Sequence, residues 1–322
     1  MAIIMTPYID LDSLETEGQN ESTRDIDVVS TEDLCRMINA QDQTVALAVA
    51  QHTSTIARII DAMAPRVRAG GRVVYLGAGT SGRLGILDAS EIPPTYSADY
   101  SQWIGLIAGG NGAIQRAVEG AEDSSPSGAQ DLEDLTPKLC SADSVIGLAA
   151  SGRTPYVLGG LEYAKSLGCF TAGICCVKNS EMRNVADEVV ECPVGPEVVT
   201  GSTRMKSGTA QKMILNMIST GIQVKIGKTY GNLMVDVKRS NHKLVNRARR
   251  IFRCVLEPLT LPPTSIKLPL NLQDDQAVDA LIDECDGSVK LAMVAARWSC
   301  TPAEATAKLN KADGLLKRAL AV

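Results

Sequence analysis

The residues best suited to chemistry lie in a glycine-rich segment, Gly77-Ala78-Gly79-Thr80-Ser81-Gly82-Arg83, which follows a short apolar run and precedes a helical pattern. A helix that begins directly after a buried strand presents free backbone N–H groups to an anion. The hydroxyls of Thr80 and Ser81 add donors, so together with Gly79 and Gly82 they form a predicted anion site that fits a phosphate. The alternative is an ordinary strand-to-helix turn, in which glycine serves only tight geometry.

Two further segments repeat this composition. One is Ser151-Gly152-Arg153-Thr154, directly before Pro155, and the other spans residues 194–208. Because hydroxyl donors carry no charge, three such loops at one edge of a sheet suit a site that holds both a phosphate and sugar hydroxyls. The candidates in the third loop are Glu197, Ser202, Arg204 and Lys206. For Arg204 and Lys206 the alternative is a place at a helix start, facing solvent.

The first loop also matches the dinucleotide fingerprint GxGxxG. A nicotinamide site needs, in addition, a carboxylate at the end of the second strand to hold the ribose hydroxyls. Residues 106–112 form the end of that strand and the loop after it, and they contain no carboxylate. Pro93-Pro94 also interrupts the segment in which the crossover helix would run. These two departures weigh against a dinucleotide.

The elements that must position these loops alternate along the chain. Strand candidates are residues 72–76, 103–107, 144–148, 169–175 and 188–192. Each is joined to the next by a segment long enough for a crossover, which predicts an α/β fold with a doubly wound parallel sheet of five strands flanked by helices. Ligands bind such sheets at the carboxyl ends of the strands, where the three loops should converge.

Helical patterns precede and follow the predicted sheet. Residues 14–27 are polar without apolar periodicity, which is typical of a disordered leader. Ser30 is expected to cap a helix, a second helical pattern covers residues 43–67, and a third covers 205–226. The apolar stripe of residues 205–226 indicates core or dimer packing.

The C-terminal part is expected to be a small helical domain. Residues 257–270 are rich in proline and are interpreted as a linker, while residues 275–286 and 288–297 have helical patterns. Thr301-Pro302-Ala303-Glu304 has the residues of a capping box. The predicted parts of the chain are N-terminal helices (1–62), the sheet domain (63–228), a connecting segment (229–270) and the C-terminal helical domain (271–322).

Composition excludes several classes of partner. A net charge of -5 and an aromatic content of 3% do not suit a nucleic-acid binder. The nine cysteines form no CxxC pair and there are only two histidines, which argues against a zinc site or a disulfide framework and favours buried free thiols. We find no signal-peptide pattern and no apolar run of the length a membrane helix needs, so we expect a cytoplasmic protein.

Several motifs resemble N-acetylmuramic acid 6-phosphate etherases, a family with a sugar-isomerase (SIS) domain. The resemblance runs from about residue 14 to 244, with the blocks in order and near the family's spacing. The matching segments are residues 76–85, 88–96, 117–124, 150–156, 199–212 and 231–237. The resemblance implies an SIS-type sheet, an ordered leader, a UBA-like C-terminal domain and a homodimer. The proline-rich stretch departs from the pattern.

The resemblance also implies a reaction. The family cleaves the D-lactyl ether of N-acetylmuramate 6-phosphate with water, giving N-acetylglucosamine 6-phosphate and D-lactate. In the opened sugar a base can remove the proton on C2, lactate leaves C3, and water adds back, a route that needs two carboxyl groups and no metal or cofactor. Glu91 matches the family's proton donor and Glu122 its second acid or base. From the residues alone, Glu119, Glu122 and Asp123 could equally form a solvated acidic face.

By the same comparison, the first two loops hold the phosphate of a sugar 6-phosphate. Glu197 is a possible contact to the sugar ring, and Ser202, Arg204 and Lys206 are weaker candidates. The alternative function is a non-catalytic SIS protein that binds a sugar phosphate and regulates a partner, as the glucokinase regulatory protein does; a sugar-phosphate isomerase is a third option. A pure sensor does not need both Glu91 and Glu122.

Overall fold

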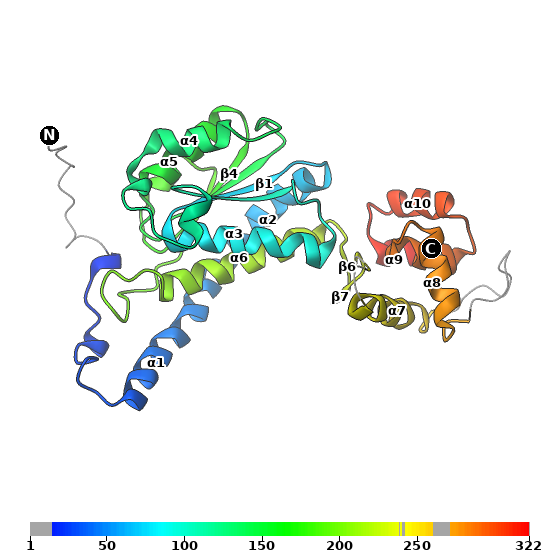
Figure 1. Cartoon of the computed structure of the whole chain (residues 1–322), viewed down its shortest axis with the longest axis horizontal. Helices are drawn as coiled ribbons and strands as arrows, with labels where there is room; N and C mark the ends of the chain where they lie inside the picture. The colour runs from blue at the N-terminus through cyan, green and yellow to red at the C-terminus, as the bar shows by residue number, and fades with distance from the viewer. Residues whose placement is uncertain (1–14, 238, 240–241, 260–270, 322) are drawn as a thin grey trace. The chain divides into compact units, whose positions relative to one another are not determined.

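The computed structural model describes residues 15–237, 239, 242–259 and 271–321. The chain divides into two compact units, and Figure 1 shows its elements in order. Among the described residues, the first unit comprises residues 15–89 and 104–218, and the second comprises residues 90–103, 219–237, 239, 242–259 and 271–321.

The first unit contains the predicted parallel sheet. Its strand order is β2-β1-β3-β4-β5, and β1, β3, β4 and β5 pair in parallel. Apolar residues fill β1, β3 and β4, which are buried along their whole length, as expected of strands covered on both faces. The strands are β1 (Val73–Gly77), β2 (Trp103–Ile107), β3 (Ser144–Leu148), β4 (Phe170–Cys175) and β5 (Glu188–Glu191), each within the range expected from the sequence or one residue beyond it.

Helices cover both faces of this sheet. Figure 1 shows α4 (Ser125–Glu133) and α5 (Pro155–Ser166) over one face, and α2 (Thr53–Arg68) over the other. Helix α3 (Gly79–Tyr96) leaves the end of β1, and α6 (Lys206–Lys225) follows the third loop. The predicted α/β class and the helix expected at 205–226 are confirmed.

The N-terminal helices begin where the sequence indicates. Helix α1 (Thr31–Ala50) is capped by Ser30, whose hydroxyl accepts a hydrogen bond from the backbone N–H of Asp33. The pattern over residues 43–67 belongs to two helices, because α1 ends at Ala50 and α2 begins at Thr53 after a turn.

The prediction of a disordered leader is wrong for residues 15–27. These residues form two short 3-10 helices, η2 (Glu15–Glu17) and η3 (Glu21–Thr23). The Thr23 hydroxyl donates to the carbonyl of Val198 at 2.9 Å, and the Asn20 amide donates to Gln41 Oε1 at 2.8 Å. The first of these partners lies 175 residues away in the chain, so no local pattern could reveal it. The ordered leader implied by the resemblance is what the structure shows here.

The expectation that Pro93-Pro94 interrupts the helix after the first loop is also wrong. Helix α3 contains both prolines and continues to Tyr96. Proline removes one backbone donor, but Ile92 and Tyr96 on either side of the pair are buried. Burial of these side chains offsets the hydrogen bonds that the prolines cannot make.

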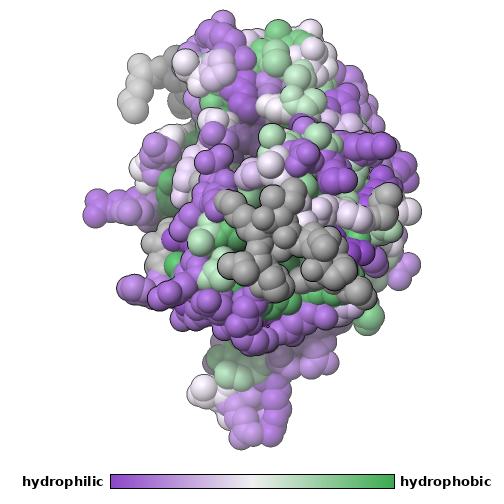
Figure 2. Space-filling view, turned by 90° about the vertical axis from the view of Figure 1, so that its right-hand side faces the viewer, coloured by the Kyte–Doolittle hydropathy of each residue, from purple (hydrophilic) through white to green (hydrophobic). Residues whose placement is uncertain are grey.

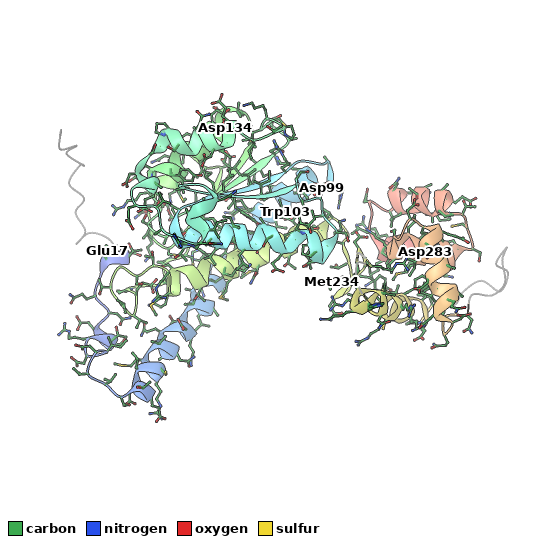
Figure 3. The ribbon with its side chains drawn as sticks, in the orientation of Figure 1. Glu17, Asp99, Trp103, Asp134, Met234 and Asp283 are labelled. Atoms are coloured by element: carbon green, nitrogen blue, oxygen red, sulfur yellow. The ribbon has the colours of Figure 1, made fainter. Side chains whose placement is uncertain are left out.

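The second unit is built mainly from helices. Helices α7 to α11 pack around a core that includes Phe252, Ile282 and Met293. Thr301 and Glu304 form the predicted capping box at the start of α10. Asp283, labelled in Figure 3, forms an ion pair with Arg239 from its place in α8. The remaining elements are β6 (Thr229–Tyr230), β7 (Leu233–Met234), α7 (His242–Leu256), α8 (Asp275–Glu284), α9 (Val289–Trp298), α10 (Pro302–Lys311) and α11 (Leu316–Leu320).

Most of the predicted proline-rich linker, residues 260–270, lies outside the described residues. The four-part division of the chain stays a prediction. All nine cysteines are free, but the expectation that they are buried holds only in part, because Cys35, Cys140 and Cys254 are exposed. Within the part of the chain that the structure describes, no helix is both long and apolar enough to span a membrane. Figure 2 shows a face on which hydrophilic side chains predominate.

Candidate active site

The first loop joins β1 to α3 through a tight turn. Gly79, the first residue of α3, has a φ of +51°, which suits glycine. A Cβ on Gly82 would lie 2.6 Å from Ile107 Cγ1 and 2.8 Å from the Gly77 carbonyl oxygen, so only glycine lets the helix approach the strand ends this closely. Gly79 is exposed, Thr80 is half-buried and Ser81 is buried. The first turn of a long helix therefore presents backbone and hydroxyl donors at the sheet edge.

The second loop begins beside the first. In the parallel pairing of β1 with β3, Gly77 lies opposite Leu148, so the two loops leave the sheet at the same level. Gly152 has a φ of +68°, and its carbonyl accepts a hydrogen bond from the Ser180 hydroxyl at 2.9 Å. Thr154 is the N-cap of α5 but makes no side-chain capping hydrogen bond. The Thr154 hydroxyl therefore lies at the N-terminus of α5 without accepting a hydrogen bond from the backbone N–H groups of that helix.

The third loop reaches the first through the start of α6. A Cβ on Gly208 would lie 3.4 Å from Thr80 Cγ2. The Ser81 hydroxyl donates to Gln211 Oε1 at 2.8 Å across 130 residues of chain. The structure thus brings the ends of the first and third loops together, as the position of the loops after parallel strands predicts.

Glu197 is held inside the protein by the start of α6. Its carboxylate accepts hydrogen bonds from the backbone N–H of Lys206 and from the N–H and hydroxyl of Ser207, each at 2.9 Å. The side chain is 1% exposed. A carboxylate of the protein therefore already occupies the anion-binding end of α6. A contact between Glu197 and a sugar ring stays a prediction.

The remaining candidates of the third loop differ in exposure. Lys206 is 2% exposed, and its ammonium donates to Gln41 Oε1 at 3.1 Å; burial lowers its pKa, against the raising effect of Glu197 and Asp42. Arg204 is exposed, as its alternative role at a helix start predicts, and Ser202 is half-buried.

The N-terminal leader covers this third loop. Glu17, labelled in Figure 3, lies so close to Gly201 that a Cβ there would be 2.8 Å from its carboxylate oxygen. Gln41, which accepts from Lys206, also accepts from Asn20, and Asn20 donates to the carbonyl of Pro196 at 3.2 Å. No local pattern in the sequence indicates these contacts.

A pocket of about 150 Å³ opens at the carboxyl ends of β1 and β2. Gly79 of the first loop lines one part of it, and the segment from Ala117 to Glu122 lines another. Glu122 lies in the short 3-10 helix η5 (Ala121–Asp123). Burial raises the pKa of Glu122, and the charges of Asp123 and Glu119 raise it further. The structure therefore places a carboxyl group with raised basicity in the same pocket as the first loop.

Arg83 is a pocket residue that the predicted site set did not contain. Its guanidinium donates to the carbonyls of Ile114 at 2.8 Å and Ala113 at 2.9 Å. These carbonyls lie at the end of the 3-10 helix η4 (Asn111–Ile114), so Arg83 ties α3 to the segment that leads toward Glu122. Its place directly after the glycine loop was the signal in the sequence that could have found it.

Glu91 lies on α3, beyond the first loop, and is exposed. The buried carboxylate of Asp88, one turn earlier on the helix, fixes this part of α3. It accepts from the Tyr75 hydroxyl at 2.9 Å and from the Lys212 ammonium at 2.7 Å. The role of Glu91 as proton donor stays a prediction.

The fold and the loops at its sheet edge define the class of protein. A model of the SIS domain matches residues 125–220, and a model of the glucokinase regulatory protein N-terminal SIS domain matches residues 55–165. The chain is therefore an SIS-domain protein.

Its relatives narrow the class to one family. An N-acetylmuramic acid 6-phosphate etherase of Lactobacillus acidophilus is 57% identical over 77% of this chain and 83% of its own. Etherases of Caldanaerobacter subterraneus (46% identical, 96% of both chains) and Escherichia coli O139:H28 (48% identical, 96% of this chain and 98% of its own) match nearly end to end. The chain belongs to the N-acetylmuramic acid 6-phosphate etherase family, whose members are lyases, and the resemblance seen in the motifs is confirmed.

Proposed function

We propose that this protein cleaves the D-lactyl ether of N-acetylmuramate 6-phosphate with water, giving N-acetylglucosamine 6-phosphate and D-lactate. Relatives named for this activity match along 96% of the chain, which supports the reaction. The observation that carries the proposal within the structure is the pocket that joins Gly79, at the anion-binding end of α3, to Glu122. A phosphate at α3 would direct the rest of an opened sugar into that pocket.

The chemistry assigns a role to each carboxyl group. Glu122, with its raised pKa, removes the proton on C2, which is acidic because it lies next to the C1 aldehyde. The electron pair forms the C2–C3 double bond, the bond from C3 to the ether oxygen breaks, and Glu91 gives the departing lactate oxygen its proton. Water then adds to C3 while C2 takes up a proton. Bonds and charges balance without a metal or a redox cofactor.

A labelling experiment tests this order of events. Purified protein is given N-acetylmuramate 6-phosphate in D₂O, and D-lactate and the sugar product are measured. We expect lactate release, with one deuterium at C2 of the N-acetylglucosamine 6-phosphate. Lactate release without deuterium at C2 would refute the elimination, and the absence of lactate would refute the activity and favour a sugar-phosphate sensor. The relatives do not favour that sensor, although one matched domain model bears the regulator's name.

We also propose that two copies of the chain associate. Only Val45 and Val49 of α1 are buried, whereas Leu47 on the same helix is 70% exposed. An exposed apolar side chain on a mostly exposed helix is expected where that helix packs against a second copy of the chain. Light scattering should give twice the chain mass of 34.1 kDa, and Leu47→Glu should shift it toward the monomer. A monomeric wild-type protein would contradict this proposal.

We place the reaction in the cytoplasm, without nucleic acid or membrane partners. The exposed free thiols of Cys35, Cys140 and Cys254 support a reducing compartment. Fractionation of cells that express the natural gene tests this, and recovery of the protein outside the cytoplasmic fraction would contradict it.

A further inference from the structure

Gln211 is a buried polar residue to which neither the predicted site nor the proposed mechanism gives a role. It lies on α6 and is 1% exposed. Its Oε1 atom accepts the hydrogen bond of the Ser81 hydroxyl at 2.8 Å, while its Nε2 atom is buried without a hydrogen-bond partner among the described residues. Buried amide N–H groups are nearly always paired, and a rotation of this carboxamide would bring its N–H to the Ser81 hydroxyl that its oxygen now contacts.

The direction of the hydrogen bond matters for the anion site. A serine hydroxyl carries one proton, and here that proton points to Gln211. An anion at the first turn of α3 needs the same proton as a donor. A half-turn of the Gln211 carboxamide exchanges its oxygen and nitrogen, which have nearly the same shape. The amide N–H then donates to Ser81 Oγ at the same separation, and the Ser81 proton is released toward the anion.

We propose that Gln211 is a positioning residue for phosphate binding, which turns the Ser81 hydroxyl into a donor when a phosphate arrives at the first loop. The start of α6 lies near the same loop, since a Cβ on Gly208 would be 3.4 Å from Thr80 Cγ2, so the helix that carries Gln211 is held close to the anion site. The inference rests on the sugar-phosphate part of the proposed function and not on the cleavage step. Because the amide acts on the phosphate, far from C2 and C3, its loss should raise KM and leave kcat nearly unchanged.

The test measures binding of inorganic phosphate by calorimetry, so it stays informative whether or not the protein releases lactate. Gln211→Glu keeps an acceptor for the Ser81 proton but has no N–H to give. In the wild-type background we expect phosphate affinity to fall at least tenfold. In the Ser81→Ala background, where no hydroxyl remains to be turned, the same substitution should cost less than threefold.

Two outcomes would overturn the inference. An unchanged affinity of Gln211→Glu would show that the amide only braces the two helices. An equal loss in both backgrounds would show that the new charge repels phosphate directly. If Gln211→Glu does not fold, Gln211→Met replaces it in the same pair of backgrounds, with the same expected non-additivity.

The matched control is Gln223→Met. Gln223 is also a fully buried glutamine of α6, and both polar atoms of its side chain are without partners among the residues described. We expect Gln223→Met to bind phosphate like the wild type. A comparable loss of affinity in this variant would mean that any change in the buried face of α6 disturbs the loop, and would refute a specific role for Gln211.

Discussion

Replacement of Glu197 by glutamine separates a positioning role from a chemical one. The carboxylate accepts three hydrogen bonds at 2.9 Å from the first two residues of α6, and its charge acts against the lowering of the pKa of the buried Lys206 ammonium. A carboxamide has one oxygen, so it can keep the two bonds from Ser207, but its NH₂ group would then face the N–H of Lys206. A neutral group also offers weaker acceptors than the carboxylate it replaces.

The loss follows from these contacts. A hydrogen bond to a charged group contributes about 1.5–3 kcal/mol, so losing one bond and leaving a donor against a donor should destabilise the start of α6 by roughly 2–3 kcal/mol. At about 1.4 kcal/mol for each factor of ten, the backbone amides of residues 206–212 should exchange with solvent roughly 30 to 150 times faster. Because α6 braces Ser81, KM for the sugar phosphate should rise as well.

Hydrogen exchange followed by mass spectrometry measures this directly. The control is Glu191→Gln, which removes a buried carboxylate that accepts from the N–H groups of Asn179 and Ser180. It should speed exchange around residues 179–184 and leave residues 206–212 unaffected. Unchanged exchange at the start of α6 in Glu197→Gln, together with abolished lactate release, would refute the reasoning and make Glu197 a group that acts on the sugar.

Three further predictions concern the pocket. Glu122→Gln should lower kcat by about 10²- to 10⁴-fold with a small change in KM, because a general base is removed; steady-state lactate release measures this, and full activity would contradict the assignment. The pKa of Glu122 is raised, so the acid-side fall of kcat/KM should occur at a pH above the ordinary glutamate range. Glu119→Gln removes one of the charges that raise this pKa, so the acid-side fall should move to lower pH. An unchanged pH profile would contradict the assignment of this fall to Glu122. Arg83→Met should lower kcat/KM about tenfold through loss of two hydrogen bonds to the pocket segment, and Arg83→Lys should not restore it; recovery by lysine would show that charge alone matters.

Local sequence patterns determined most of the scaffold. The five strands were predictable because short apolar runs bounded by glycine loops have few other stable conformations between two layers of helices. Ser30 and the Thr301 capping box marked helix starts, since a side-chain oxygen there satisfies backbone N–H groups only a few residues away. The loops after the strands were expected to share one sheet edge, which is a property of parallel topology.

Tertiary structure decided which polar residues are buried and what they contact. Lys206 and Arg204 are two residues apart, and both carry a positive charge that could bind an anion, yet only Lys206 is buried. The hydrogen bonds of Ser81 with Gln211 and of Thr23 with Val198 join residues that are 130 and 175 positions apart in the chain. Helix α3 continues through two prolines because Ile92 and Tyr96, on either side of them, are buried. These outcomes depend on long-range packing, whose free energy exceeds local preference and leaves no local pattern in the sequence.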